Sequence, residues 1–143
     1  MSQTIRVAAI QLDAALSSVA DRLAHAEQHI ATAAEQGAQL VVLPAQFATG
    51  MSYDDVLYER SEPIDGQIVQ WMQSQARQHQ VHVAGSLLLW DVDDIYHASL
   101  LIAPDGHIWR YDQQFPYLWE RTLFRDGDRI LIAETALGKI GLL

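Results

Sequence analysis

Two short apolar segments on either side of one helical stripe constrain the fold of this chain more than any other feature. Residues Ile5–Leu12 form a largely apolar run of strand length, as expected for a strand covered on both faces. Ser17 or Ser18 can cap a helix that ends near Gly37, and Leu40–Leu43 follows as a second buried strand. The helical stripe consists of Val19, Leu23, Ala26, Ile30 and Ala33. This β-α-β pattern predicts two parallel neighbouring strands joined by a right-handed crossover.

The rest of the chain adds one further helix and several strands. Asp65 can cap that helix, whose inward face carries Ile68, Met72, Ala76 and His79. The Pro-Asp-Gly sequence at 104–106 is typical of a tight turn. It predicts a hairpin between Ile95–Ala103 and His107–Tyr111. Other strands are predicted at Val81–Leu89, Arg129–Glu134 and Lys139–Leu143, with an acidic turn at Asp91–Asp94 and a loop or short helix at Phe115–Phe124. The order of elements indicates an α/β fold without repeats or linkers.

Composition narrows the possible partners and compartment. Among 143 residues, 18 acidic and 9 basic side chains give a formal net charge of −9. This balance argues against nucleic acid and against an anionic membrane surface, because both require a basic footprint. The apolar run Val7–Leu12 is too short to cross a membrane, and the chain contains no cysteine. We therefore expect a cytoplasmic protein with no disulfide, no cofactor and no metal.

The segment Leu40–Gly50 resembles an active-site strand that lacks its reactive side chain. Its sequence, Leu-Val-Val-Leu-Pro-Ala-Gln-Phe-Ala-Thr-Gly, is an apolar strand that runs into Pro44. The next residue is placed at the carboxyl end of the strand, where α/β proteins commonly position chemistry. That residue is Ala45, whose methyl group can neither accept a proton nor attack a substrate.

Five segments, taken in order, resemble the carbon–nitrogen hydrolase (nitrilase/amidase) superfamily. They are Ile5–Leu12 as the first strand; Ala34–Gly50 as the family's GA-x-LVVLPE-x-F-x-TG segment; Tyr96–Tyr111 as its "YN…PDG…Y" hairpin, with His97 where Asn is usual; Tyr111–Pro116 with Trp119–Arg121 and Phe124 as its lysine loop; and Gly138–Leu143 as the lead-in to its cysteine strand. The resemblance implies a partial α-β-β-α sandwich of the nitrilase type. Because the sequence ends within an apolar strand pattern, we expect residues 1–143 to be the N-terminal part of such a domain.

The resemblance also implies a set of catalytic positions. In the family a cysteine attacks an amide or nitrile carbon, a glutamate acts as general base, a lysine stabilises the developing charge and a second glutamate positions the group. Carried over to this sequence, the general base falls on Ala45 and the lysine on Gln113, while the cysteine falls just beyond Leu143. Only Glu120 matches, as the second glutamate. We therefore expect no amidase or nitrilase turnover from this chain.

Two functions remain open at this point. The first is an inactive relative that serves as a binding or assembly module, with a small amide or nitrile as a possible ligand. Self-association, or association with an intact homologue, would cover the strand edge that follows Leu143. The alternative is a fragment of an amidase or nitrilase, although truncation does not explain the replacements at Ala45 and Gln113. A different, small α/β ligand-binding fold is a third possibility. The family resemblance would be refuted if Ile5–Leu12 and Leu40–Leu43 were not adjacent.

Other side chains are candidate reactive or metal-binding groups. Thr49, Ser52 and Ser86 are hydroxyls outside any Gly-x-Ser-x-Gly or Ser-x-x-Lys context, so turn and strand roles are favoured. Two further candidate groups are histidines four residues apart on the first helix and an oxygen-rich cluster near the acidic turn. They are His25 with His29, and Asp91, Asp93 and Asp94 with His97. Exposed histidines and a solvated turn are the better interpretations, because the usual metal motifs are missing.

Two interpretations near the lysine-loop segment stay balanced. The aromatic side chains there could line a pocket, form a partner surface or pack into the core. These aromatic residues are Trp109, Tyr111, Phe115, Tyr117, Trp119 and Phe124. Glu120 could keep a site position or form an ion pair with Arg121 or Arg125. The surrounding Trp-Glu-Arg match favours the site position.

Overall fold

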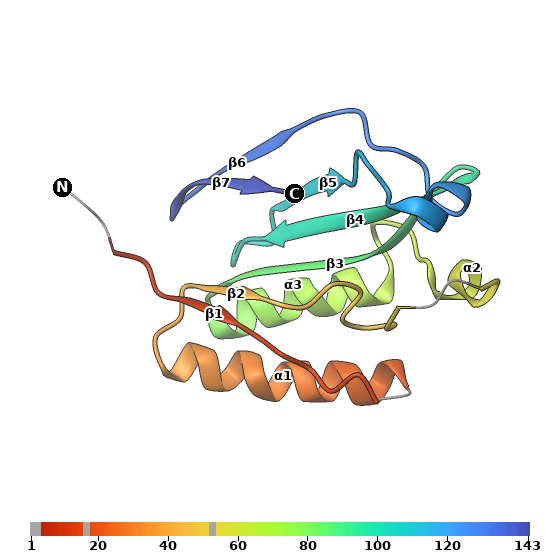
Figure 1. The fold of residues 1–143 in the computed structure, drawn as a ribbon. Helices are drawn as coiled ribbons and strands as arrows, with labels where there is room; N and C mark the ends of the chain where they lie inside the picture. The colour runs from red at the N-terminus through yellow and green to blue at the C-terminus, as the bar shows by residue number, and fades with distance from the viewer. Residues whose placement is uncertain (1–3, 16–17, 52–53) are drawn as a thin grey trace.

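A five-stranded mixed sheet organises the molecule (Figure 1). The computed structural model describes residues 4–15, 18–51 and 54–143. Strands run in the order β1-β2-β3-β4-β5; β1, β2 and β3 are parallel, whereas β3-β4 and β4-β5 are antiparallel. The strands are β1 (Val7–Ala9), β2 (Leu40–Val42), β3 (His82–Asp91), β4 (Asp94–Ile102) and β5 (Ile108–Asp112).

The predicted β-α-β unit is confirmed. Val7 pairs with Leu40 in a parallel register, so β1 and β2 are neighbours, as the family resemblance requires. Helix α1 (Val19–Glu35) joins them and begins at Ser18, whose Oγ accepts the Asp21 N–H at 3.0 Å. Ser17, the other proposed cap, lies outside the described residues. Gly37 follows the helix with φ of 82°, a left-handed conformation that glycine adopts without strain.

Strand β1 is less buried than the sequence indicated. Its apolar composition predicted cover on both faces, but Val7 and Ala9 are exposed and only Ala8 packs against the main core. The reason is position, because β1 forms the edge of the five-stranded sheet. In β2, Val41 is buried, as predicted, whereas Val42 is exposed on the opposite face.

Helix α3 (Gln67–His79) begins differently from the prediction. Asp65 is exposed and does not cap it. Instead, Glu62 accepts the backbone N–H groups of Ile68 at 3.1 Å and Val69 at 2.9 Å. This carboxylate satisfies free donors at the positive end of the helix dipole from outside the helix. A short helix, α2 (Val56–Arg60), precedes it.

The predicted hairpin and acidic turn are both confirmed. Strands β4 and β5 pair from Ile102–Ile108 to Ala98–Asp112, and the Ala103 N–H donates to His107 O across the turn at 2.9 Å. Strands β3 and β4 meet at the Asp91–Asp94 pair. The Phe115–Phe124 segment contains a 3-10 helix, η1 (Leu118–Thr122), as expected of a loop or short helix.

Helices α1 and α3 cover one face of the sheet (Figure 1). Apolar side chains alternate along β3 and β4, so one set from each strand faces the helices. The main core on this side includes Ile30, Met72, Leu87, Leu100 and Ile102. The helices and the large sheet thus correspond to one outer helical layer and the adjacent sheet layer of the predicted sandwich.

A separate two-stranded sheet lies over the other face of the large sheet (Figure 1). It pairs β6 (Leu131–Thr135) with β7 (Gly138–Leu142) in antiparallel register. Ala133 is fully buried against Leu40 and Leu101 in a smaller apolar cluster. The resulting helix–sheet–sheet order confirms the predicted partial α-β-β-α sandwich. Across the described residues, no helix is both long and apolar enough to span a membrane.

Candidate functional site

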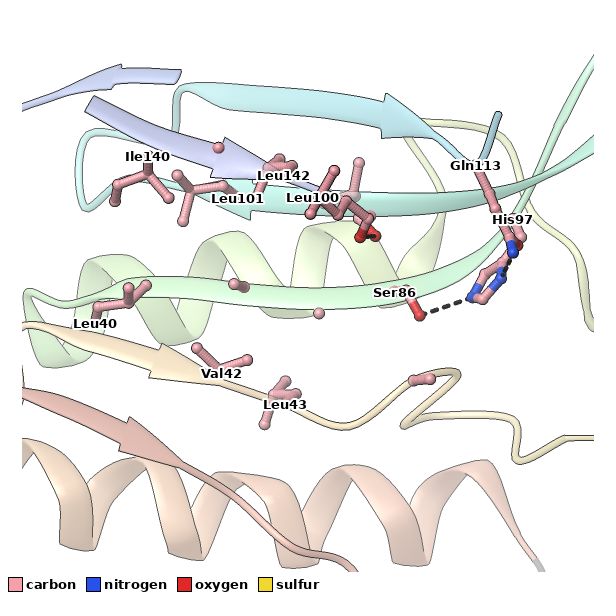
Figure 2. A pocket seen from close by; sticks show the side chains of 16 residues that line it. Leu40, Val42, Leu43, Ser86, His97, Leu100, Leu101, Gln113, Ile140 and Leu142 are labelled. Carbon is pink, nitrogen blue, oxygen red and sulfur yellow. Dashed lines mark hydrogen bonds between the residues drawn. The ribbon is translucent and has the colours of Figure 1, made fainter. Parts of the chain in front are cut away.

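A cavity of about 460 Å³ lies between the large sheet and the two-stranded sheet (Figure 2). Its walls come from β2, β3, β4 and β7, and its apolar lining includes Val42, Leu101, Ile140 and Leu142. Ala45 and Gln113, two of the three positions singled out from the sequence, both line it. A cavity of this size fits a small ligand in largely apolar surroundings.

Ala45 sits at the cavity rim, just beyond the carboxyl end of β2. The chain is held there by the Leu43 N–H, which donates to Ala84 O at 2.8 Å. It then turns sharply at Gln46, whose φ of 46° is left-handed and whose O accepts the Gly50 N–H at 2.8 Å. The turn directs position 45 toward the cavity, where it offers only a methyl group.

A series of hydrogen bonds crosses the same face of the sheet, and Figure 2 shows its Ser86–His97–Gln113 part. The Gln46 backbone N–H donates to Ser86 Oγ at 3.1 Å. Ser86 Oγ lies 2.9 Å from His97 Nε2, and His97 Nδ1 lies 2.8 Å from Gln113 Oε1. Gln113 Nε2 in turn donates to Glu120 Oε2 at 3.5 Å. Residues from β3, β4 and η1, together with Gln46 after β2 and Gln113 directly after β5, thereby form one polar connection.

Glu120 is a buried carboxylate and not a surface ion pair. Its Oε2 accepts the backbone N–H of Tyr117 at 2.7 Å in addition to the Gln113 amide. The two proposed ionic partners are engaged elsewhere, because Arg121 donates to Pro116 O and Arg125 pairs with Asp94 at 3.7 Å. Glu120 reaches the cavity only through Gln113, so it positions that side chain from behind.

The positions of the protons along this series of hydrogen bonds follow from its two end groups, Glu120 and the Gln46 N–H. An ionised Glu120 can only accept, so the Gln113 NH₂ group faces it and Oε1 faces His97. Nδ1 of a neutral His97 must then carry the proton, which leaves Nε2 as an acceptor. The Ser86 hydroxyl therefore donates to Nε2 and accepts from the Gln46 N–H. All four side chains are satisfied by this single arrangement.

The metal interpretations are not supported by the placement of their residues. His25 and His29 are exposed on α1. At the acidic turn, Asp91 pairs with Arg110 at 2.7 Å and Asp94 with Arg125, while His97 joins the chain toward Gln113 instead. In the part of the chain that the structure describes, no group of three metal-binding side chains comes together.

Arg110 forms ion pairs with two of the acidic side chains near that turn. It lies 2.8 Å from Asp112, 2.7 Å from Asp91, and 5.3 Å above the Tyr96 ring centre. Burial alone would lower the pKa of the guanidinium, but hydrogen bonds and attraction from Asp112 and Asp91 raise that pKa above its ordinary value. These acidic residues therefore serve a structural ion-pair network.

The aromatic concentration divides into two groups. Tyr111 and Phe124 are buried, and Trp109 packs with the small cluster beneath the two-stranded sheet. Phe115, Tyr117 and Trp119 are exposed. Core packing thus accounts for one half of the group, while the other half forms an apolar surface on the loop around η1.

Sequence motifs did not identify Ser86, the hydroxyl that lines the cavity and contacts His97. Thr49 donates weakly to Gly50 O at 3.4 Å, and Ser52 lies outside the described residues. Ser86, by contrast, is paired with His97 on the neighbouring strand. The alternation of side chains along the strands predicts this pair. Ser86 lies opposite Ser99, and His97, two residues before Ser99, points to the same face of the sheet.

Comparison with known proteins gives a consistent signal. A family model described as carbon-nitrogen hydrolase matches residues 6–143. A nitrilase from Pyrococcus abyssi is 28% identical over 127 residues, covering 87% of this chain and 48% of that protein. The chain therefore spans about half the length of this relative.

Solved structures share the fold. A CN-hydrolase superfamily protein from Xanthomonas campestris, with an arsenic adduct in its active site, superposes with a TM-score of 0.88 at 23% identity, over 98% of this chain and 52% of that one. A mutant amidase from Nesterenkonia sp., which shows Michael addition of acrylamide at its active-site cysteine, gives a TM-score of 0.82 at 20% identity, over 98% and 57%. At these identities the likeness concerns the fold.

Proposed function

Because this chain belongs to the carbon–nitrogen hydrolase family, we propose that residues 1–143 form the N-terminal part of such a domain and lack its cysteine-dependent catalysis. The observation that supports this proposal is that two cavity-lining positions, 45 and 113, hold side chains that cannot perform the family's chemistry. Gln113, at the position where the resemblance implies a lysine, is a neutral amide held between His97 and Glu120. Ala45, at the general-base position, offers no proton acceptor.

The size of the expected loss supports an inactive amidase. A general base contributes roughly 10²–10⁴ in rate, and one stabilising donor roughly 10²–10³. Gln113 can still donate a neutral N–H, but it brings no positive charge to a developing anion. No cysteine is present among the 143 residues to form the covalent intermediate. The alternative, a fragment of an active amidase or nitrilase, is weakened by Ala45 and Gln113, which are replacements within the chain itself.

We propose that the cavity instead binds a small amide or nitrile without turning it over. Its mixed lining supports this, since aliphatic side chains enclose a space that opens onto the Ser86–Gln113 polar chain. NMR titration with propionamide and propionitrile tests this proposal. We expect shifts at the Gln46 backbone N–H and the Gln113 side-chain amide.

A matched pair of variants makes the titration decisive. Val42 lines the cavity and is 37% exposed, whereas Val19 on α1 is 39% exposed and lies away from it. Val42→Phe should fill the cavity and abolish the shifts, and Val19→Phe should leave them intact. Equal binding by both variants, or no binding by the wild type at tens of millimolar ligand, would contradict the proposal.

An assembly role is the second candidate, favoured by the exposed apolar surface of the two-stranded sheet. Ile132 on β6 is 60% exposed, and both strands of that sheet pair only with each other in the described residues. Unpaired edges with apolar side chains favour association, with a second copy or with an intact homologue. We place this association in the cytoplasm, on the basis of the cysteine-free composition.

Light scattering at increasing concentration tests the self-association. We expect a wild-type dimer that Ile132→Lys converts to a monomer. Val92→Lys is the control, because Val92 is 90% exposed at the β3–β4 turn, outside the two-stranded sheet. A wild-type monomer at the highest concentration would overturn self-association.

A further inference from the structure

The Ser86–His97 pair has the geometry of a nucleophile and its base. The two residues lie on adjacent antiparallel strands, with Ser86 opposite Ser99 and His97 opposite Leu88. This diagonal placement brings Ser86 Oγ within 2.9 Å of His97 Nε2 on the cavity face (Figure 2). Hydrogen-bond contact between a hydroxyl and an imidazole is the arrangement that activates serine nucleophiles.

The base is oriented by a third group, as a working pair requires. His97 Nδ1 donates to Gln113 Oε1 at 2.8 Å, and Gln113 is in turn held by the buried Glu120. This leaves the Nε2 lone pair directed at the Ser86 hydroxyl. A neutral amide is an accepted orienting group, since papain-like proteases use Asn behind their histidine.

The serine also faces a ligand-sized space. Ser86 is only 8% exposed, yet it lines the cavity together with His97 and Gln113. Val42, Leu101 and Leu142 supply apolar walls that suit a short aliphatic chain. The Gln46 backbone N–H, 3.1 Å from Ser86 Oγ, is a fixed donor next to the reacting atom.

We propose that Ser86 and His97 make this cavity an acyl-accepting site for activated esters of short aliphatic acids, an activity separate from carbon–nitrogen hydrolysis. Ser86 Oγ attacks the ester carbonyl carbon while its proton passes to His97 Nε2. The bond from the carbonyl carbon to the leaving oxygen then breaks, and the leaving group takes that proton from His97, which restores the neutral imidazole. Water then gives a proton to His97 and attacks the acyl carbon, the bond from that carbon to Ser86 Oγ breaks, and Oγ takes the proton back. The net reaction converts one ester and one water into one carboxylic acid and one alcohol or phenol.

The single backbone donor sets the expected substrate class. Oxyanion sites normally aim several donors at the developing charge, and each is worth roughly 10²–10³ in rate. Among the described hydrogen bonds, the Gln46 N–H is the backbone donor beside Ser86, and it is directed at Ser86 Oγ itself and not at a separate oxyanion position. An aryl ester, whose leaving group needs little assistance, therefore fits this site better than an amide.

Intact-protein mass spectrometry after incubation with p-nitrophenyl butyrate and with a fluorophosphonate probe tests the proposal. We expect one adduct per chain, mapped to Ser86 by peptide sequencing. Ser86→Ala should lose the adduct, and His97→Asn should slow its formation by about 10²-fold or more, because Asn retains hydrogen bonding but cannot act as a base. Ser74→Ala, on the exposed side of α3, should label at the wild-type rate.

A second set of variants keeps the test valid if Ser86→Ala does not fold. Because the chain has no cysteine, Ser86→Cys introduces one unique thiol. Its alkylation by iodoacetamide should be faster than that of Ser99→Cys, which places a thiol in the same cavity without the histidine contact. Adding His97→Asn should remove the advantage of the Ser86→Cys thiol.

The contrary results are equally clear. An adduct on another residue, unchanged labelling of His97→Asn, or no adduct on the folded wild type would overturn the acyl-accepting site. Equal alkylation of the two thiols would also overturn it. Amide and nitrile turnover is measured separately, so none of these outcomes depends on the proposed loss of cysteine chemistry.

Discussion

The two faces of the central sheet differ in what their side chains do. Toward α1 and α3, β3 and β4 present Leu87, Leu89, Leu100 and Ile102, all fully or almost fully buried. Toward the two-stranded sheet, the same strands present Ser86, His97 and Ser99 beside an open cavity. One alternating sequence thus builds an apolar core on one side and a polar surface on the other. The helix-covered face holds the main core, and the cavity face holds the polar side chains on which the proposed functions rest.

The largest expected effect compares two leucines on these faces. Leu100 is fully buried in the main core, whereas Leu142 on β7 is half-buried at the cavity. Leu100→Ala should lower the free energy of unfolding by about 2–5 kcal/mol, since it removes packed atoms and leaves a void. Leu142→Ala should have a smaller effect, of about 1 kcal/mol, because its site is already open. Urea unfolding measures both, and equal losses would remove the distinction between the faces.

Glu120 provides the next test, within the polar part of the cavity face. Replacing this buried carboxylate in Glu120→Leu removes the acceptor of the Tyr117 N–H and one of the two acceptors of the Gln113 amide, which also donates to Phe115 O at 3.5 Å. The expected loss is about 1–3 kcal/mol, the cost of leaving partly buried donors unpaired. Glu134→Leu is the control, because that side chain is exposed on β6 and should change stability by less than about 0.5 kcal/mol. If Glu120→Leu left the free energy of unfolding unchanged, these hydrogen bonds would not stabilise the fold.

A smaller effect is expected at the start of α3. Glu62→Ala removes the acceptor of the Ile68 and Val69 N–H groups and should cost about 1 kcal/mol. Asp65→Ala, at the residue that local capping rules favoured, should have almost no effect. Thermal unfolding of the two variants compares them directly, and the reverse order would restore Asp65 as the cap.

The smallest expected effect is a pH dependence at His82. Burial lowers the pKa of this histidine from its ordinary 6.5, although a backbone hydrogen bond at Gln39 and the charge of Asp105 act in the opposite direction. The unfolded chain therefore binds the proton at a higher pH than the folded chain does. Stability should be fully present above pH 6.5 and should fall as the pH decreases from there toward the folded pKa.

His82→Phe should flatten that part of the stability profile, as measured by urea unfolding between pH 8 and pH 5. His82→Gln is a second variant that keeps a polar side chain but cannot titrate. A profile whose slope below pH 6.5 is unchanged in both variants would show that His82 is not its source.

The sequence predicted the fold where local patterns determine it. The spacing of Val19 to Ala33 and the apolar runs on either side produced the β-α-β unit, and the Pro-Asp-Gly turn located the β4–β5 hairpin. The Glu62 cap was missed because it reaches six and seven residues ahead, beyond the range of capping rules. The exposure of β1 depended on its edge position, which requires the full strand order.

The candidate site was predicted only in part, because one of its contacts depends on how neighbouring strands pair. Ala45 and Gln113 were brought to one cavity, and Glu120 was placed behind Gln113. The pairing of Ser86 with His97 was missed, because motif rules look for neighbours along the chain and this contact depends on cross-strand register. With the register of β3, β4 and β5 known, the alternation of side chains along each strand would have placed Ser86, His97 and Gln113 on the same face of the sheet.

The central claim is that this chain keeps a carbon–nitrogen hydrolase scaffold without its cysteine chemistry. The most direct measurement is ammonia release from a panel of aliphatic amides and nitriles, using the unmodified chain and the Ala45→Glu/Gln113→Lys double variant. We predict no release above buffer from either protein, because restoring the base and the cation does not supply the cysteine that attacks the amide or nitrile carbon, and the Ser86 site is suited to activated esters. Sustained ammonia release by the unmodified chain would contradict the account.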